Sequence, residues 1–258
     1  MNFEQELKTA LEASRASGDI QMSLFGKKFE VDFKQDKSPV TNVDKECELA
    51  IINRISDVFP NDGFLGEETG SISGKSGRRW IIDPIDGTRP FIYGLPFFST
   101  LIAMEEDDER LIGVIHLPAM NQTYYATRGS GAFCNRKNIK VSGTKNISKM
   151  HGAVCGWNEF KNINSERLQN FCKKAGYLFG FNDAYSYACV ASGKMDFVIS
   201  IVDKPWDNAS PSVIVREAGG IFSDFEGNDR IDKGCSVVSN GRIHDKLINA
   251  LAGTDKNS

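Results

Sequence analysis

The segment from Asp83 to Thr88, with the sequence Asp-Pro-Ile-Asp-Gly-Thr, constrains the fold of this 258-residue chain more than any other. It follows the apolar run Trp80-Ile81-Ile82, which predicts a short buried strand. Because proline disfavours helical dihedral angles in the residue before it, we expect the chain to turn at Asp83. Gly87 and Thr88 then predict a short helical turn, whose first N–H groups have no partner inside the helix.

This segment brings two carboxylates, Asp83 and Asp86, close to a set of free N–H groups. Mg²⁺ prefers hard oxygen ligands in octahedral geometry, completed by water and substrate phosphate, and a helix start is suited to bind phosphate. Two buried carboxylates without a cation cost several kcal/mol, a penalty that a metal ion removes. For an isolated segment of this kind, the alternative is an ordinary Asx turn followed by a helix cap.

Three further acidic positions stand at predicted turns or helix starts. Asp44 suits the N-cap of a helix that continues to Phe59, and Glu67-Glu68 follows a glycine turn. Asp207 begins another predicted helix, where capping is again the simplest role. Each position alone has this ordinary structural explanation, and only their combination points to a shared site.

Apolar spacing along the rest of the chain predicts alternating helices and strands. We expect an amphipathic helix at the N-terminus, and further helices over residues 44–59, 165–175, 183–192 and 207–218. Strands are predicted over residues 29–33, 97–104, 111–116, 122–127, 197–201 and 221–225. Blocks of helices and strands in this order indicate a layered α/β architecture.

Bulk properties exclude several classes of protein. A net charge of −3 argues against a broad nucleic-acid footprint, which needs a surplus of Lys and Arg. No apolar run is long enough to span a bilayer, and the N-terminus lacks the uninterrupted apolar stretch of a signal peptide. Six scattered cysteines without a C-x-x-C pair fit reduced thiols. We therefore expect a cytoplasmic protein that binds neither nucleic acid nor membranes.

Three motifs in one order carry a family resemblance: Gly66-Glu67-Glu68, then Asp83 to Thr88, then Trp206-Asp207 with Glu217-Ala218-Gly219-Gly220. They resemble the inositol monophosphatase family, which also includes histidinol-phosphate phosphatases. The resemblance covers nearly the whole chain, from Ser38-Pro39-Val40-Thr41 through Gly220 and beyond.

The resemblance implies a five-layer αβαβα sandwich formed as one domain over residues 1–258. Residues 1–140 would bind metal and phosphate, and residues 141–258 would face the substrate. The implied activity is that of a Mg²⁺-dependent phosphomonoesterase acting on a small phosphorylated metabolite. A homodimer is implied as well.

The resemblance also assigns roles to the acidic residues. Two or three Mg²⁺ ions, with Mn²⁺ as an alternative, would bind to Glu67, Asp83, the carbonyl of Ile85, Asp86 and Asp207. Glu68 would lie near a weaker third metal site. The N–H groups of Gly87 and Thr88 would bind the phosphate. Glu67, Thr88 and Asp44 form the implied catalytic set, in which Thr88 and Asp44 orient the attacking water.

The chemistry follows from these roles. Metal coordination lowers the pKa of a bound water, and the metal ions offset the charge of the phosphate and of the leaving alkoxide. In-line displacement then needs positioning and charge stabilisation from the protein. No histidine or cysteine nucleophile is required.

Substrate choice rests on fewer residues. In inositol-selective members an acidic residue precedes the aspartate of the Trp-Asp pair by seven positions, where this chain has Ser200. The segments Asp183-Ala184-Tyr185 and 88–96 look more like the histidinol-phosphate type. Asp183 could pair with the cationic amine or imidazole of histidinol phosphate, and its alternative role is to cap a helix start.

We also expect Arg89 and Trp206 to contact the substrate. Arg89-Pro90 stands where nucleotide phosphatases of the family carry Glu-Phe, so a nucleotide 3′-phosphatase ranks below an inositol-1-phosphate phosphatase as an alternative. A catalytically silent relative that only binds a phosphometabolite is the alternative from another class. The intact acidic set argues against it.

Overall fold

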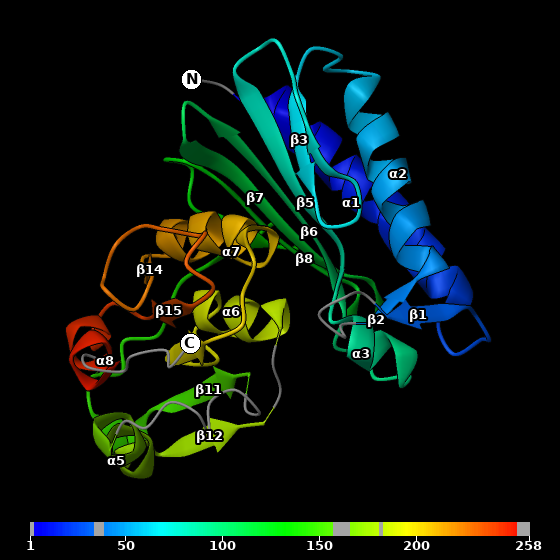
Figure 1. The fold of residues 1–258 in the computed structure, drawn as a ribbon. Coiled ribbons are helices and arrows are strands. Elements are labelled where there is room, and N and C mark those ends of the chain that lie inside the picture. The colour runs from blue at the N-terminus through cyan, green and yellow to red at the C-terminus, as the bar shows by residue number, and fades with distance from the viewer. Residues whose placement is uncertain (1–2, 34–38, 157–165, 181–182, 252–258) are drawn as a thin grey trace.

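The structure is a computed structural model that describes residues 3–33, 39–156, 166–180 and 183–251. Helices and sheets alternate in five layers, which confirms the predicted αβαβα sandwich (Figure 1). Each of the three helix layers contains a pair of helices. The first has α1 (Glu4–Leu24) and α2 (Asn42–Ser56), the second or middle layer has α6 (Ala184–Ala191) and α7 (Pro205–Glu217), and the third has α5 (Glu166–Lys174) and α8 (His244–Leu251).

The larger sheet lies between the first and second helix layers. Its eight strands have the order β10-β9-β8-β7-β6-β5-β3-β4 among the described residues, and only β3 and β5 pair in parallel. Because helices cover both faces, β6 is buried at seven successive positions. The strands are β3 (Gly63–Gly66), β4 (Gly70–Ile72), β5 (Arg78–Asp86), β6 (Ser99–Glu106), β7 (Glu109–Leu117), β8 (Gln122–Thr127), β9 (Ala132–Cys134) and β10 (Lys137–Ile139).

The smaller sheet separates the second helix layer from the third. Its order is β12-β11-β13-β15-β14, with parallel pairing of β11 to both neighbours. Its strands are β11 (His151–Cys155), β12 (Tyr177–Phe179), β13 (Phe197–Ser200), β14 (Ile221–Ser223) and β15 (Ser236–Ser239). A separate hairpin of β1 (Val31–Phe33) and β2 (Pro39–Thr41) lies near the short helix α3 (Thr88–Ile92) (Figure 1).

The predicted strand before the turn is longer than expected. β5 continues through Asp86 instead of ending near Asp83, because Pro84 lies in a bulge of the strand. The register pairs Asp83 with Leu101 and Asp86 with Ser99, so the two residues between the aspartates face only Thr100. A bulge suits proline, since it has no N–H to give to the ladder. It also turns both aspartates toward one end of the sheet.

Two predicted helix caps are wrong in a way that matters for the site. Thr41, not Asp44, is the N-cap of α2, and Asp44 sits three residues inside the helix. Its Oδ2 accepts from the Thr41 N–H at 2.7 Å, which closes a capping box. Asp207 likewise lies inside α7, where its Oδ2 accepts from the Lys204 N–H at 2.7 Å. In each case one carboxylate oxygen fixes the helix start and the other is left for the site.

The middle helix layer packs closely against the larger sheet. A Cβ added to Gly113 of β7 would lie 2.4 Å from the carbonyl oxygen of Ser210 on α7, so glycine is needed for this approach. The largest apolar cluster is shared by α6, α7 and the facing strands. No helix among the described residues has the length and apolar character needed to cross a membrane.

Candidate active site

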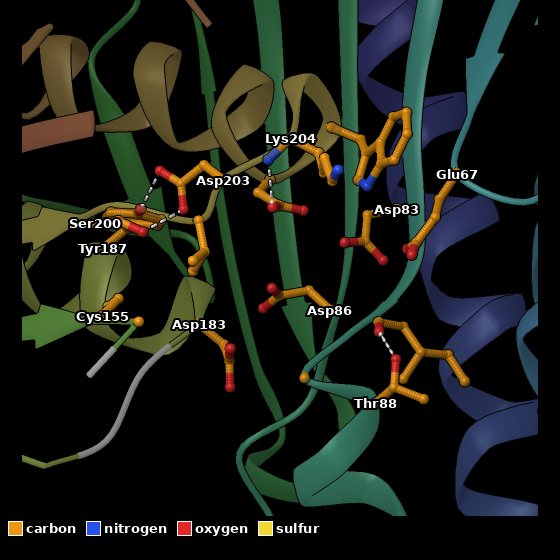
Figure 2. A pocket seen from close by; sticks show the side chains of 16 residues that line it. Glu67, Asp83, Asp86, Thr88, Cys155, Asp183, Tyr187, Ser200, Asp203 and Lys204 are labelled. Atoms are coloured by element: carbon orange, nitrogen blue, oxygen red, sulfur yellow. Dashed lines mark hydrogen bonds between the residues drawn. The ribbon is translucent and has the colours of Figure 1, made fainter. Parts of the chain in front are cut away.

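A cleft of about 430 Å³ opens where the end of β5 meets the beginnings of α6 and α7 (Figure 2). Its wall is strongly acidic, and Lys204 is the one lysine or arginine among the described residues that line it. The acidic side chains that line it are Glu67, Asp83, Asp86, Asp183, Asp203 and Asp207. Glu67, Asp83 and Asp86 lie toward one end, and Asp183 and Asp203 lie toward the other (Figure 2). Asp207 belongs with Asp83 and Asp86.

Three carboxylates at the first end come within ligand distance of one cation. One oxygen from each of Asp83, Asp86 and Asp207 lies within 4.8 Å of the others. Figure 2 shows Glu67 reaching toward Asp83 from the loop after β3. The structure thus brings to one cleft the four acids for which the sequence predicts a shared site.

Burial and mutual repulsion make the charged forms of these carboxylates unfavourable. Burial raises the pKa of Asp83 well above its usual range, and the carboxylates of Glu67 and Asp86 raise it further. Burial does the same to the pKa of Asp207. One oxygen of Asp83 is buried with no hydrogen-bond partner among the described residues. A divalent cation supplies the missing partner and offsets the repulsion, so these residues fit a metal such as Mg²⁺.

Asp86 is anchored from both halves of the chain. Its Oδ2 accepts from Ser99 Oγ at 3.0 Å and from the backbone N–H of Ala184 at 2.7 Å. Its pKa is raised by burial first, then by Asp183 and Asp207. The two hydrogen bonds fix one carboxylate oxygen and leave the other directed toward the cleft.

The loop that carries Glu67 is held by a buried residue that sequence reasoning missed. Glu48 on α2 accepts from the backbone N–H groups of Glu68 and Thr69 at 3.0 and 2.7 Å. Glu48 follows Asp44 by one helical turn, and this spacing could have indicated its direction. Glu68 itself does not line the cleft.

The segment after Asp86 forms the predicted turn into a short helix. Gly87 has a φ of 83° and a Cβ there would lie 2.6 Å from the Phe97 carbonyl oxygen, so only glycine fits. Thr88 begins α3, where the first N–H groups have no partner within the helix. Thr88 Oγ1 donates to the carbonyl of Ile85 at 3.1 Å and lies 3.5 Å from Asp44 Oδ1.

Asp44 stands behind Thr88 and does not line the cleft. Burial raises the pKa of its carboxyl to about 6, although hydrogen bonds from Thr41 lower it. An acid with this pKa changes its protonation state close to neutral pH, as a proton acceptor near a reacting water requires.

The other end of the cleft contains a buried carboxylate, Asp203, that the sequence did not single out. Its side chain accepts from Tyr187 OH at 3.0 Å, from Ser236 Oγ at 2.6 Å and also from Ser200 Oγ. Burial raises its pKa, and these hydroxyls oppose that rise. Because their protons point to Asp203, Ser200 and Tyr187 present lone pairs to the cleft.

Asp183 lies beside this group at the first position before α6. Its side chain makes no capping hydrogen bond, so the alternative role proposed for it is not seen in the structure. Its pKa is raised to about 6, by burial and then by Asp203. Trp206 lines the cleft as expected, whereas Arg89 is exposed and is not among the lining residues.

Comparisons with known proteins point to one family. The profile of the inositol monophosphatase family matches residues 2–255. A histidinol-phosphatase of Chlorobaculum parvum is 36% identical over 97% of this chain and 98% of its own. A fructose-1,6-bisphosphatase/inositol-1-monophosphatase of Thermotoga maritima is 35% identical over 95% of each. The structure of extragenic suppressor protein suhB from Bartonella henselae superposes with a TM-score of 0.90 at 30% identity, over 98% of this chain and 100% of that one.

Fold, acidic cleft and these relatives together define a phosphoric monoester hydrolase of a metal-dependent class. The match covers both sheets and every acidic residue of the cleft. The chain belongs to the inositol monophosphatase family.

Proposed function

We propose that this protein is a Mg²⁺-dependent phosphatase whose preferred substrate is of the histidinol phosphate type. The observation that carries the proposal is the division of one cleft into two acidic ends. One end has the four carboxylates that fit metal ions, and the other has Asp183 and the hydroxyl-bonded Asp203. A phosphate ester with a cationic leaving group complements both.

The proposed metal ligands are Glu67, Asp83, the carbonyl of Ile85, Asp86 and Asp207, which all line the cleft and would hold two or three ions. Bound there, Mg²⁺ supplies charge neutralisation for the phosphate and makes a water molecule acidic near neutral pH. Mn²⁺ is the alternative ion, since it accepts the same oxygen ligands. Residues 1–140 thus supply most of the metal and phosphate contacts, and residues 141–258 supply Asp207 and the substrate side.

The protein groups hold the phosphate and direct the attack. In our proposal, N–H groups of Gly87 and Thr88 bind phosphate oxygens at the start of α3. The Thr88 hydroxyl then turns its proton from the Ile85 carbonyl to Asp44 Oδ1, which lies 3.5 Å away, and uses a lone pair to accept from the attacking water. Asp44, with its pKa of about 6, is then able to receive the proton.

The leaving group is recognised by a wall that offers mainly acceptors. Asp183 presents a carboxylate, and the hydroxyl oxygens of Ser200 and Tyr187 present lone pairs, because their protons are directed to Asp203. Ammonium and imidazolium groups have donors and no acceptor, so they match this wall without leaving a polar atom unpaired. Trp206 adds a flat apolar surface beside it. Arg89 remains a predicted substrate contact that would require movement of its exposed side chain.

Inositol 1-phosphate is the second candidate substrate. The Thermotoga relative named fructose-1,6-bisphosphatase/inositol-1-monophosphatase favours it, and inositol hydroxyls can also donate to Asp183. A second anionic group on the leaving group would meet Asp183 and Asp203, which ranks nucleotide 3′-phosphates below both. A silent binding relative ranks last, because the metal-binding acids are all present.

The deciding experiment compares kcat/KM for histidinol phosphate and inositol 1-phosphate at saturating Mg²⁺. We expect histidinol phosphate to be preferred by at least about tenfold, the equivalent of roughly 1.4 kcal/mol. A tenfold preference for inositol 1-phosphate would reverse the assignment. Absence of Mg²⁺-dependent phosphate release from a panel of phosphomonoesters, with Asp86→Asn as the inactive control, would leave only the silent relative.

A homodimer in the cytoplasm completes the proposal. Exposed apolar side chains at Phe33, Tyr93 and Leu95 provide a surface that a second copy can cover, and all six cysteines are free thiols. Light scattering on the purified protein tests the dimer, which requires a mass of twice 28.5 kDa.

A further inference from the structure

We propose that Gln21, on helix α1, is a positioning residue for the metal site, and that it acts by holding the carbonyl of Pro84. Gln21 Nε2 lies 2.8 Å from the Pro84 carbonyl oxygen, across 63 residues of sequence. Thr100 Oγ1 donates to the same oxygen at 3.1 Å, and Ser17 Oγ approaches it at 3.5 Å. The inference rests on the proposed metal site.

These groups form one closed network, which we call the Pro84 clamp: Ser17, Gln21 and Thr100. Ser17 Oγ and Thr100 Oγ1 are 2.7 Å apart, and Gln21 Nε2 lies 2.7 Å from Thr100 Oγ1 and 3.1 Å from Ser17 Oγ. All three side chains are fully buried. The amide orientation follows from the network, since a carbonyl oxygen needs a donor opposite it.

The clamped carbonyl has a special place in the backbone. It belongs to the peptide unit between Pro84 and Ile85, inside the bulge that separates the two metal-binding aspartates. In a regular ladder this carbonyl would be paired with the neighbouring strand. Here the bulge turns it toward α1, so side chains replace the strand as its partner. Its orientation sets the direction of the Ile85 carbonyl and the separation of Asp83 from Asp86.

Stability alone is a poor explanation for a glutamine at this position. Gln21 Oε1 is buried and has no hydrogen-bond partner among the described residues, which is unfavourable for stability. An apolar side chain of similar length would remove that cost, and would leave the Pro84 carbonyl with only the weaker contacts of Thr100 and Ser17. The glutamine therefore lowers the stability of the fold but fixes the bulge that contains Pro84.

A fixed loop matters because metal ligands must be placed within a few tenths of an ångström. Residues that orient metal ligands typically contribute 10–100-fold to metal affinity. If the Pro84 clamp orients the metal ligands, its loss weakens metal binding and leaves the substrate contacts of the cleft in place. The dissociation constant for Mg²⁺ should then change while KM for the substrate does not.

The test measures Mg²⁺ binding to the full chain without substrate, by calorimetry, in wild type, Gln21→Met and Thr100→Val. We expect the dissociation constant for Mg²⁺ to rise about tenfold in Gln21→Met. KM for phosphate ester at saturating Mg²⁺ should stay within about twofold, and Tm in EDTA should be unchanged or higher. Ser14→Ala is the matched control: Ser14 is buried on the same helix, but its hydroxyl donates only to Leu11 of its own helix, at 3.1 Å.

Three results would overturn the inference. Unchanged Mg²⁺ affinity in both Gln21→Met and Thr100→Val excludes a positioning role. Equal weakening in Ser14→Ala shows a general effect of disturbing α1. A fall in Tm in EDTA that accounts for the whole loss of affinity shows a merely structural role. If wild type itself binds no Mg²⁺, the proposed function falls as well, whereas normal wild-type binding confines any failure to the Pro84 clamp.

Discussion

The backbone N–H of Ala184 donates to Oδ2 of Asp86 at 2.7 Å, although 98 residues separate them in sequence. The bond joins the end of β5 in the larger sheet to the first turn of α6 in the middle helix layer. The carboxylate cluster is thus built on both sides of the cleft, since Asp207 also comes from that helix layer. Its geometry depends on how the larger sheet packs against α6 and α7.

Replacement of Asp86 by Asn tests the conflict between stability and function in the cluster. The amide oxygen of Asn can still accept from Ala184, so the fold should be kept. One of the mutually repelling carboxylates is lost, and Tm in EDTA should therefore rise. Loss of a proposed metal ligand should lower kcat/KM by at least about 100-fold, the upper end for residues that only support ligands. A lower Tm in EDTA would show that the hydrogen bonds weakened by the amide outweigh the relief of charge repulsion.

The buried aspartates should make the metal-free protein less stable as pH rises, and the lowered pKa values of His116 and His244 oppose this trend below about pH 6.5. The folded pKa of Asp44 and Asp183 is about 6, against 3.8 for an ordinary aspartate, so the folded chain binds more protons than the unfolded chain over this interval. The stability that these two groups contribute is present below about pH 4 and is lost as the pH rises to about 6. Burial also raises the pKa values of Asp83, Asp86 and Asp207, so these three groups contribute a loss of the same sign.

Thermal melts in EDTA at pH 5 and pH 7.5 check this sign. We expect a higher Tm at pH 5, by several degrees, and a Mg²⁺-induced rise in Tm that is larger at pH 7.5. Ionised carboxylates bind the cation, whereas protonated ones do not. A higher Tm at pH 7.5 in EDTA would contradict the raised pKa values.

The resemblance of three motifs to a known family allowed prediction of the reaction class, and strong strand and helix signals beside these motifs allowed prediction of where the acidic residues lie. Trp80-Ile81-Ile82 and the glycine of Asp-Gly-Thr place Asp83 and Asp86 almost without tertiary information. The supporting residues were not visible. Glu48 and Gln21 lie inside helices, where their spacing only predicts a buried face, and their partners are backbone atoms of distant loops. Side-chain to backbone contacts of this kind leave no local pattern.

Thr88→Val should separate catalysis from metal binding. The hydroxyl that bonds to the Ile85 carbonyl and faces Asp44 is removed, while the N–H groups of α3 remain. We expect kcat to fall about 10²–10⁴-fold, the range for loss of a positioned proton-transfer group, with Mg²⁺ affinity unchanged. Thr88→Ser keeps the hydroxyl and should recover most of the activity. Equal losses in both variants would assign the effect to packing.

Ser200→Ala should weaken discrimination between leaving groups. The variant removes one acceptor of the cleft wall and one of the three hydroxyls that bond to Asp203. We expect kcat/KM for a cationic leaving group to fall by about tenfold, with little change for a neutral alkyl phosphate of similar size. Steady-state kinetics on this substrate pair gives the comparison. A parallel fall for both substrates would place Ser200 outside leaving-group recognition.

Glu48→Ala should loosen the loop that presents Glu67. The buried carboxylate of Glu48 accepts from the N–H groups of Glu68 and Thr69, and its removal leaves both donors without this partner. The free energy of unfolding should fall by about 1–3 kcal/mol, and the Mg²⁺ dissociation constant should rise about tenfold.

Urea unfolding in EDTA and Mg²⁺ calorimetry measure the two effects of this substitution separately. Glu46→Ala is the matched control, because Glu46 is exposed on the same helix. Glu48→Gln keeps one acceptor oxygen and should lie between wild type and Glu48→Ala in both measurements. An unchanged Mg²⁺ affinity in a clearly destabilised Glu48→Ala protein would mean that Glu67 holds its position without support from α2.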